Sequence, residues 1–287
     1  MPELPEVEVV KRSLKKKLIN LLIKKVNINT NKLRYLIDKK KFDKIINKKV
    51  LSITRRSKYI LINLQENLTI IVHLGMTGKF FILDKNKKSK TSFYYDLKKN
   101  DSNHDHIVFT FNKNIKLIYN DIRKFGFLKI ETTSNLKFNS HIRLLGPEPL
   151  TKSFNIKYFK NYIINKKKNL KNVLMDQKFV SGLGNIYVNE ILYLSKLDPK
   201  RSINTLKKDD LKNIISFTKK ILKKSIHNGG SSVKNFNDSN GEIGNFQQCF
   251  QVYARDGKKC LKNSCSGIIN KTIISSRSTF ICKTCQK

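Results

Sequence analysis

Four cysteines near the C-terminal end constrain this chain more than any other feature. Cys260 and Cys265 are separated by four residues, Cys282 and Cys285 by two, and sixteen residues lie between the pairs. Each pair can sit on a tight turn, and two facing turns form a tetrahedral thiolate cage that suits Zn²⁺. Four protein ligands leave no open coordination position, so we expect one structural zinc ion that folds a short segment. Four unrelated thiols, the alternative, fit this spacing poorly.

The net charge indicates a polyanionic partner. The 287 residues include 59 Lys and Arg against 21 Asp and Glu, a formal charge of +38. Such a positive field attracts nucleic acid, although the even spread of the lysines also fits the composition of an A/T-rich genome. No apolar run reaches the length of a membrane span, and the first ten residues do not form a secretory signal. We therefore expect a cytoplasmic protein that does not enter a membrane.

The hydrophobic pattern changes near residue 150, which predicts an α+β chain with more than one domain. Residues 5–18 are expected to form an amphipathic helix, and short β-rich runs between residues 50 and 130 suit an antiparallel β-sandwich. Two prolines and a glycine at 145–150 indicate a hinge. The predicted helices that follow are 153–165, 169–178, 185–195 and 207–227.

The amino-terminal residues offer a nucleophile. If Met1 is removed, Pro2 becomes a secondary amine whose pKa lies near the α-amino value of about 8, so part of it is unprotonated at neutral pH. Such an amine can attack a sugar carbon and form an iminium, and Glu3 is placed to protonate the ring oxygen as a general acid. Proline at the second position is common, so this pair alone is not specific.

The complete opening run, residues 2–8, resembles the start of the formamidopyrimidine-DNA glycosylases, bacterial enzymes that excise oxidised purines from DNA. The resemblance covers essentially the whole chain, and the family's other motifs occur in its order. They are Lys58 within 57–59 (SKY), 73–78 (HLGMTG), 104–106 (HDH), 121–126 (DIRKFG), the hinge at 145–150, 176–177 (DQ), 182–187 (GLGNIY) and Arg277 within 277–280 (RSTF).

The resemblance implies roles for particular residues in base excision repair. Pro2 is the Schiff-base nucleophile, Glu3 the proton donor, Lys58 the group serving β-elimination and Arg277 the group serving δ-elimination. Lesion excision requires the nucleotide to be flipped out, and the gap is filled by side chains. The resemblance implies that Met76, Arg123 and Phe125 fill the gap in the DNA. It also implies that the DNA phosphate backbone is bound by Lys124, His73, His104, Lys166, Lys171 and Asn185.

The resemblance also implies domain boundaries and a binding partner. It implies a catalytic sandwich at 1–134, a hinge at 135–150, a helix-two-turn-helix DNA-binding domain at 151–236 and a β-hairpin zinc finger at 237–287. The implied partner is double-stranded DNA with oxidised purines or abasic sites, bound by a monomer at the bacterial nucleoid. The loop around 231–244 is expected to read the lesion base, and the sequence does not rank 8-oxoguanine against formamidopyrimidines.

Three departures from the family pattern are visible. Ile122 replaces the usual proline and Lys124 the usual second arginine, which predicts a less rigid loop and a phosphate contact without a planar fork. The spacing between Cys260 and Cys265 is two residues wider than is usual, which lengthens one zinc turn without removing a ligand.

Two alternative functions remain open from the sequence. A protein similar to endonuclease VIII would use the same amine on oxidised pyrimidines, although that group usually has glycine where this chain has Leu4. A zinc-finger protein that binds DNA without catalysis would keep the basic surface and the cysteines, but would not need Pro2, Glu3, Lys58 and Arg277 together.

Overall fold

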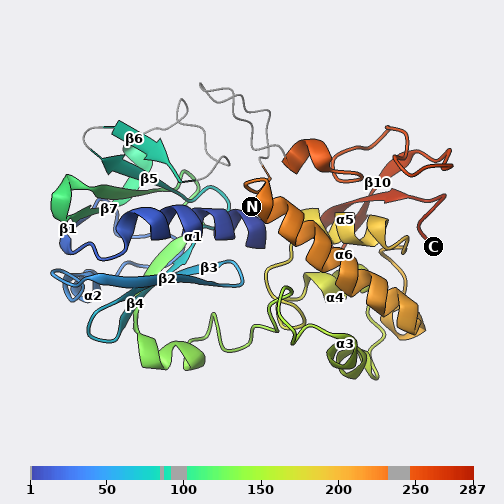
Figure 1. Ribbon diagram of the computed structural model, residues 1–287, viewed down its shortest axis with the longest axis horizontal. Helices are drawn as coiled ribbons and strands as arrows, with labels where there is room; N and C mark the ends of the chain where they lie inside the picture. The colour runs from blue at the N-terminus through green and yellow to red at the C-terminus, as the bar shows by residue number, and fades with distance from the viewer. Residues whose placement is uncertain (1, 85–86, 92–101, 232–245) are drawn as a thin grey trace. The chain divides into compact units, whose positions relative to one another are not determined.

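The computed structural model describes residues 2–84, 87–91, 102–231 and 246–287, and these form two compact units. The first unit contains the described residues up to Arg143 and also residues 228–231, and the second contains the described residues from Leu144 to His227 and from Phe246 to Lys287 (Figure 1). The predicted domain boundaries after residues 134, 150 and 236 stay predictions. Among the described residues, no helix has both the length and the apolar character needed to cross a membrane.

Two antiparallel sheets make up most of the first unit, as the sandwich prediction required. One sheet has the strand order β1-β7-β8-β5-β6 and the other β2-β3-β4-β9. The side chains between the sheets form a large apolar core. The strands are β1 (Ile23–Ile28), β2 (Val50–Arg56), β3 (Tyr59–Leu64), β4 (Leu68–His73), β5 (Lys79–Asp84), β6 (Lys87–Lys90), β7 (Asp105–Phe111), β8 (Lys116–Asn120) and β9 (Phe127–Thr132).

Helix α1 (Leu4–Leu18) lies between the two sheets and is drawn in blue in Figure 1. Val7, Val10, Leu14 and Leu18 recur at helical spacing and are fully buried in the shared core. The positive residues of the last turn lie at the negative end of the helix dipole. Burial of this apolar stripe fixes the residues that precede the helix, because a helix held along its length has little freedom at its first turn.

The second unit combines helices with a two-stranded hairpin, which agrees with the predicted fold class. Residues 176–184 connect α4 to α5, and the Gln177 side chain holds this turn by donating to the Leu183 carbonyl and accepting from the Gly182 amide. The helices are α3 (Ile156–Ile163), α4 (Leu170–Met175), α5 (Asn185–Leu194) and α6 (Lys208–His227), and the hairpin strands are β10 (Ile269–Ile274) and β11 (Arg277–Cys282).

The observed elements are close to those predicted, with differences at the ends. The helix predicted from residue 153 begins at Ile156, because the Asn155 side chain accepts a hydrogen bond from the Tyr158 amide and caps the helix. Strand β1 and the short helix α2 (Lys39–Asp43) lie outside the predicted β-rich region and were not among the predicted elements. Among the described strands β1 pairs only with β7, so it lies at the edge of its sheet, and it carries lysines in place of an apolar run.

Candidate active site and zinc centre

The start of α1 is held by a buried carboxylate. Glu6 is only 2% exposed, and its Oε2 accepts a hydrogen bond from the Glu3 amide at 2.9 Å. Its Oε1 accepts from both the amide and the hydroxyl of Ser231, at 2.7 and 2.8 Å. Pro2 and Glu3 are themselves buried. Of the loop predicted to read the base, only Ser231 belongs to the described residues, and residues 232–244 lie outside them.

Lys58 occupies the two-residue turn between β2 and β3, where Arg56 pairs with Tyr59. Ser57, the other turn residue, has a left-handed backbone with φ of 55°. The Arg55 side chain fixes this turn because its Nη1 donates to the Ser57 carbonyl at 2.8 Å. The turn therefore presents a defined backbone beneath Lys58, whose side chain is largely buried.

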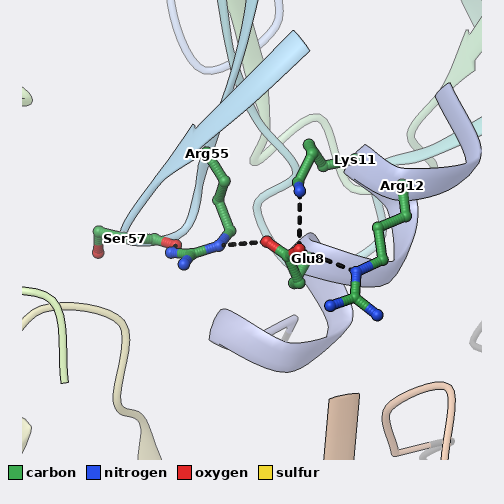
Figure 2. Close-up of polar contacts among 5 residues, drawn as sticks. All are labelled: Glu8, Lys11, Arg12, Arg55 and Ser57. Atoms are coloured by element: carbon green, nitrogen blue, oxygen red, sulfur yellow. Dashed lines mark hydrogen bonds and ion pairs between the residues drawn. The ribbon is translucent and has the colours of Figure 1, made fainter. Parts of the chain in front are cut away.

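A second carboxylate connects this turn to α1, as Figure 2 shows. Glu8 Oε2 accepts from Arg55 Nε at 3.0 Å, while its Oε1 contacts Lys11 at 2.7 Å and Arg12 at 3.0 Å. Burial alone would raise the pKa of Glu8, but hydrogen bonds from Lys11 and Arg55 outweigh it and lower this pKa. The helix that follows Pro2 and Glu3 is thereby joined to the turn that carries Lys58.

The residues predicted to fill the DNA gap lie around one cavity in the first unit. The cavity has a volume of about 1010 Å³. Met76 and Phe125 are 37% and 45% exposed, and the Arg123 guanidinium lies 4.5 Å from the centre of the Phe125 ring. The cavity is lined by His73, Gly75, Met76, Arg123, Lys124, Phe125 and the segment 30–34.

Sequence reasoning missed segment 30–34 because it contains no family motif. Its contribution to the cavity includes Lys32 and Arg34, two cationic side chains. The Arg34 amide donates to the Gly126 carbonyl at 3.1 Å, which attaches the segment to the loop that carries Phe125. A signal was present in the alternation of positive and apolar residues, but it does not distinguish a binding surface from an ordinary solvated loop.

His73 sits in a cluster of rings at the end of β4. Its ring is 5.0 Å from that of Tyr59 and 5.7 Å from that of Phe127. Burial, followed by the charges of Lys58 and Arg34, lowers the pKa of His73 to about 4, so the ring is neutral at pH 7. Its Nδ1 accepts from the Gly75 amide at 3.1 Å, which places the ring proton on Nε2.

The other predicted phosphate ligands have different environments. His104 ends the short helical turn Ser102–His104, and its ring lies 6.2 Å from that of His106. Lys166 Nζ lies 3.2 Å from the centre of the Tyr162 ring, just beyond α3. Neither residue lines the cavity that contains Met76 and Arg123.

Lys171 and Asn185 meet at the hairpin that carries Arg277. Lys171 is 1% exposed and donates to the Ser278 carbonyl at 3.2 Å and to Thr279 Oγ1 at 2.6 Å. Burial, and then the charge of Arg277, lowers the pKa of Lys171 to about 8. The Asn185 amide also donates to the Ser278 carbonyl, at 2.9 Å. Two residues predicted to bind phosphate therefore support the backbone next to Arg277, and their roles toward DNA stay predictions.

Helix α5 holds the zinc-finger segment along its length. Asn189 Oδ1 accepts from the Phe280 amide at 2.8 Å. Glu190, buried and with a pKa that burial raises, accepts from three consecutive amides, those of residues 251–253. Tyr193 places its hydroxyl 3.0 Å from Cys260 Sγ. Sequence reasoning did not identify these three residues, because their partners lie more than sixty positions away.

The four predicted cysteines converge. Their sulfur atoms all lie within 4.8 Å of one another, with Cys260 and Cys285 3.9 Å apart and Cys265 and Cys282 3.7 Å apart. No disulfide joins them, so all four thiols are available as ligands. This donor set fits one tetrahedral zinc ion that closes the finger. Cys249 is not part of the group.

Comparison with known proteins agrees with this geometry. Residues 1–128 match the model of the formamidopyrimidine-DNA glycosylase N-terminal domain, residues 145–237 the H2TH domain of the same family, and residues 257–287 the zinc finger found in FPG and IleRS. Formamidopyrimidine-DNA glycosylases of Rickettsia bellii and Rickettsia canadensis are 44% and 39% identical to this chain, which is covered in full, as are 100% and 99% of the relatives.

Solved structures give the same result. The Lactococcus lactis Fpg in complex with DNA containing an abasic site is 31% identical, with a TM-score of 0.86 over 99% of each chain. The wild-type Lactococcus lactis Fpg with DNA containing N7-benzyl-Fapy-dG has the same identity and TM-score over 100% of each chain. Fold, zinc centre and relatives together define a DNA glycosylase of base excision repair. The chain belongs to the formamidopyrimidine-DNA glycosylase family.

Proposed function

We propose that this enzyme removes oxidised purines, namely 8-oxoguanine and formamidopyrimidines, from duplex DNA and then cleaves the sugar through a Schiff base on Pro2. The Lactococcus lactis relatives, which bind DNA with an abasic site or a Fapy-dG lesion, support this substrate class. The observation that carries the proposal is the arrangement at the start of α1. There a buried Glu6 fixes the Glu3 amide, and Glu8 joins the same helix to the turn of Lys58.

The first chemical step is displacement of the base. The lone pair of the Pro2 nitrogen forms a bond to C1′, and the glycosidic bond breaks with its electron pair leaving on the base. The nitrogen releases its own proton, which balances the proton that the departing base takes up. Glu3 then donates a proton to O4′ as the sugar ring opens, and the nitrogen lone pair completes the iminium.

Two eliminations follow from the iminium. Loss of a proton from C2′ breaks the C3′–O3′ bond, and loss of a proton from C4′ breaks the C5′–O5′ bond, so both phosphates leave. We assign Lys58 to the first elimination and Arg277 to the second. Water then hydrolyses the remaining iminium, which returns Pro2 to its amine form.

We assign the DNA contacts to three kinds of group. Met76, Arg123 and Phe125 enter the gap left by the flipped nucleotide, which is consistent with their exposure around one cavity. His73 donates to a phosphate as a neutral ring through Nε2–H, because its pKa of about 4 keeps it uncharged. The remaining phosphate donors in this proposal are His104, Lys124, Lys166, Lys171 and Asn185.

Borohydride trapping tests the proposal directly. Wild-type enzyme is mixed with duplexes containing 8-oxoguanine, a formamidopyrimidine, an abasic site or an oxidised pyrimidine. Borohydride is then added to reduce any iminium between enzyme and DNA. We expect a covalent adduct with the purine lesions and the abasic site, located on Pro2 by peptide mass. A control that retains an extra residue before Pro2 should still bind DNA but form no adduct. An adduct on Lys58 would contradict the assignment, and preference for the oxidised pyrimidine would favour the endonuclease VIII-like alternative.

We further propose that the enzyme acts as a monomer on nucleoid DNA in the bacterial cytoplasm. All the groups assigned to chemistry belong to one chain, so the proposed mechanism requires no residue from a second copy. Light scattering of the free enzyme and of its complex with a short duplex should give one chain per particle. A mass of two chains in both samples would contradict the proposal.

A further inference from the structure

Two loops of the first unit carry the side chains assigned to the DNA gap, and they touch through their backbones. Met76 lies in the connection between β4 and β5, while Arg123 and Phe125 lie between β8 and β9. Gly75 has φ of +62°, and a Cβ atom added to it would overlap the backbone of Phe125 and Gly126. Only glycine permits so close an approach, so a shift of one loop must displace the other.

Thr77 connects the two loops through its hydroxyl group. Its oxygen accepts from the Arg123 amide at 3.0 Å, and its proton is donated to Asp121 Oδ1 at 2.5 Å. The fully buried Asp121 uses its other oxygen to accept from the Gly126 amide at 2.8 Å and from the Tyr119 hydroxyl at 3.2 Å. A hydroxyl can donate and accept at once, which a methyl group cannot do.

The backbone between Arg123 and Phe125 needs such support. Lys124 has φ of 54°, a left-handed conformation that is uncommon for a residue with a Cβ atom. The turn is closed by the Lys124 amide, which donates to the Asp121 carbonyl at 3.2 Å. Because this conformation is strained, it persists only while surrounding contacts hold it, and Thr77 supplies the contact to the residue just before it.

We propose that Thr77 is a specificity-determining positioning residue, whose hydroxyl sets the backbone of Arg123 and so aims its guanidinium at the base opposite the lesion. This inference rests on the proposed function, in which Arg123 enters the gap. There the guanidinium donors can pair with the acceptors of an orphaned cytosine, whereas they meet a donor on the corresponding edge of adenine. An arginine that makes two hydrogen bonds to one base needs a fixed backbone, because a small backbone rotation becomes a large displacement of the guanidinium at the end of the side chain. Thr77 itself does not touch DNA in this account.

The test compares the rates at which 8-oxoguanine is excised opposite cytosine and opposite adenine, in single turnovers. Thr77→Val keeps the shape of the side chain and removes the hydroxyl, with its hydrogen bonds to Asp121 and to the Arg123 amide. We expect the ratio of the excision rate opposite cytosine to that opposite adenine to fall by about five- to tenfold. Thr77→Ser, which restores the hydroxyl, should keep the ratio within about twofold of wild type.

A matched control separates positioning from general destabilisation. Thr69 is fully buried, whereas Thr77 is half-buried, and the Thr69 hydroxyl bonds to Asn63 and Thr133, away from the gap loops. Thr69→Val should therefore lower the melting temperature without changing the ratio. If Thr77→Val does not fold, Thr77→Ala removes the same hydroxyl without adding bulk and gives the same comparison.

The outcomes also distinguish this inference from the proposed function. An unchanged ratio in Thr77→Val, together with a reduced ratio in Arg123→Ala, would overturn the role of Thr77 alone. An unchanged ratio in Arg123→Ala as well would overturn the reading of the opposite base by Arg123, and this inference with it. Borohydride trapping at an abasic site should persist in the Thr77 and Thr69 variants, and its absence in wild type would refute the Schiff base itself.

Discussion

The two units hold their proposed catalytic residues by different physical means. In the first unit, Pro2 and Glu3 precede a helix buried between two sheets, and carboxylates fix the local geometry. In the second unit, Arg277 begins a strand of a two-stranded hairpin, whose apolar cluster is small and includes two of the zinc ligands. A short segment cannot bury enough apolar surface to fold alone, so a metal site takes the place of a core.

The largest effect should come from the zinc centre. Cys282 is fully buried among the four sulfur atoms, so Cys282→Ser should abolish stable zinc binding and unfold residues 257–287. Structural zinc contributes about 10–16 kcal/mol of apparent binding free energy in small fingers. Metal analysis should show one zinc per chain in wild type and almost none in the variant, with protease cleavage confined to the finger. Cys249→Ser is the control and should keep its zinc. Full zinc content in Cys282→Ser would contradict the conclusion that the hairpin of the second unit is held by a four-cysteine zinc site.

The second prediction concerns the carboxylate at the start of α1. Glu6→Ala leaves three donors, the Glu3 amide and both groups of Ser231, without their acceptor. We expect the free energy of unfolding of the first unit to fall by about 3 kcal/mol, because buried donors would be left unsatisfied. Urea denaturation with zinc content measured in parallel should show this loss while zinc stays bound. Glu66→Ala, at an exposed ion pair with Lys48, should change stability little.

The third prediction is a pH dependence that arises from Glu8. Its pKa is lower in the folded protein than the ordinary 4.5, so its stabilising contribution is complete above pH 4.5 and is lost as the pH falls through the lower, folded value. At pH 7, Glu8→Gln should cost about 1–2 kcal/mol of unfolding free energy. The two proteins should converge in stability as the pH falls below 4.5. A difference that stays constant down to pH 3 would show that the Glu8 charge is not responsible.

The smallest effect should come from the hydroxyl beside the zinc ligand. Tyr193→Phe removes the group that lies 3.0 Å from Cys260 Sγ, and we expect zinc affinity to fall about three- to tenfold. Competition with a chelator measures this change without reference to activity. Tyr187→Phe, on the same helix but hydrogen-bonded to Ser225, is the matched control and should leave zinc affinity unchanged. Equal zinc affinities in wild type, Tyr193→Phe and Tyr187→Phe would show that the Tyr193 hydroxyl does not contribute to zinc binding.

Features encoded by local spacing were predictable from the sequence. The cysteine pairs and the apolar stripe of α1 each depend on residues close together in the chain. The exposed positions of Met76 and Phe125 were predictable only through the family resemblance, since their residue types alone would suggest core positions.

Contacts between distant parts of the chain were not predictable. Thr77 is an ordinary threonine until β8 and its following loop bring Asp121 and Arg123 to its hydroxyl. Likewise, Lys171 has the sequence character of a surface lysine, and only the packed hairpin shows that it is buried. Burial of a polar side chain depends on which segments cover it, and a single sequence does not specify that covering.

The contact between Glu6 and Ser231 has a consequence for biosynthesis. The two residues are 225 positions apart, so the ribosome has made most of the chain before the last donors for Glu6 emerge. Until then Glu6 lacks these donors, so the contacts that hold the start of α1 are incomplete during the period in which the proposed mechanism requires removal of Met1. The order of synthesis thus completes the surroundings of Pro2, the proposed nucleophile, last, which suits an amine that must be uncovered before the fold closes.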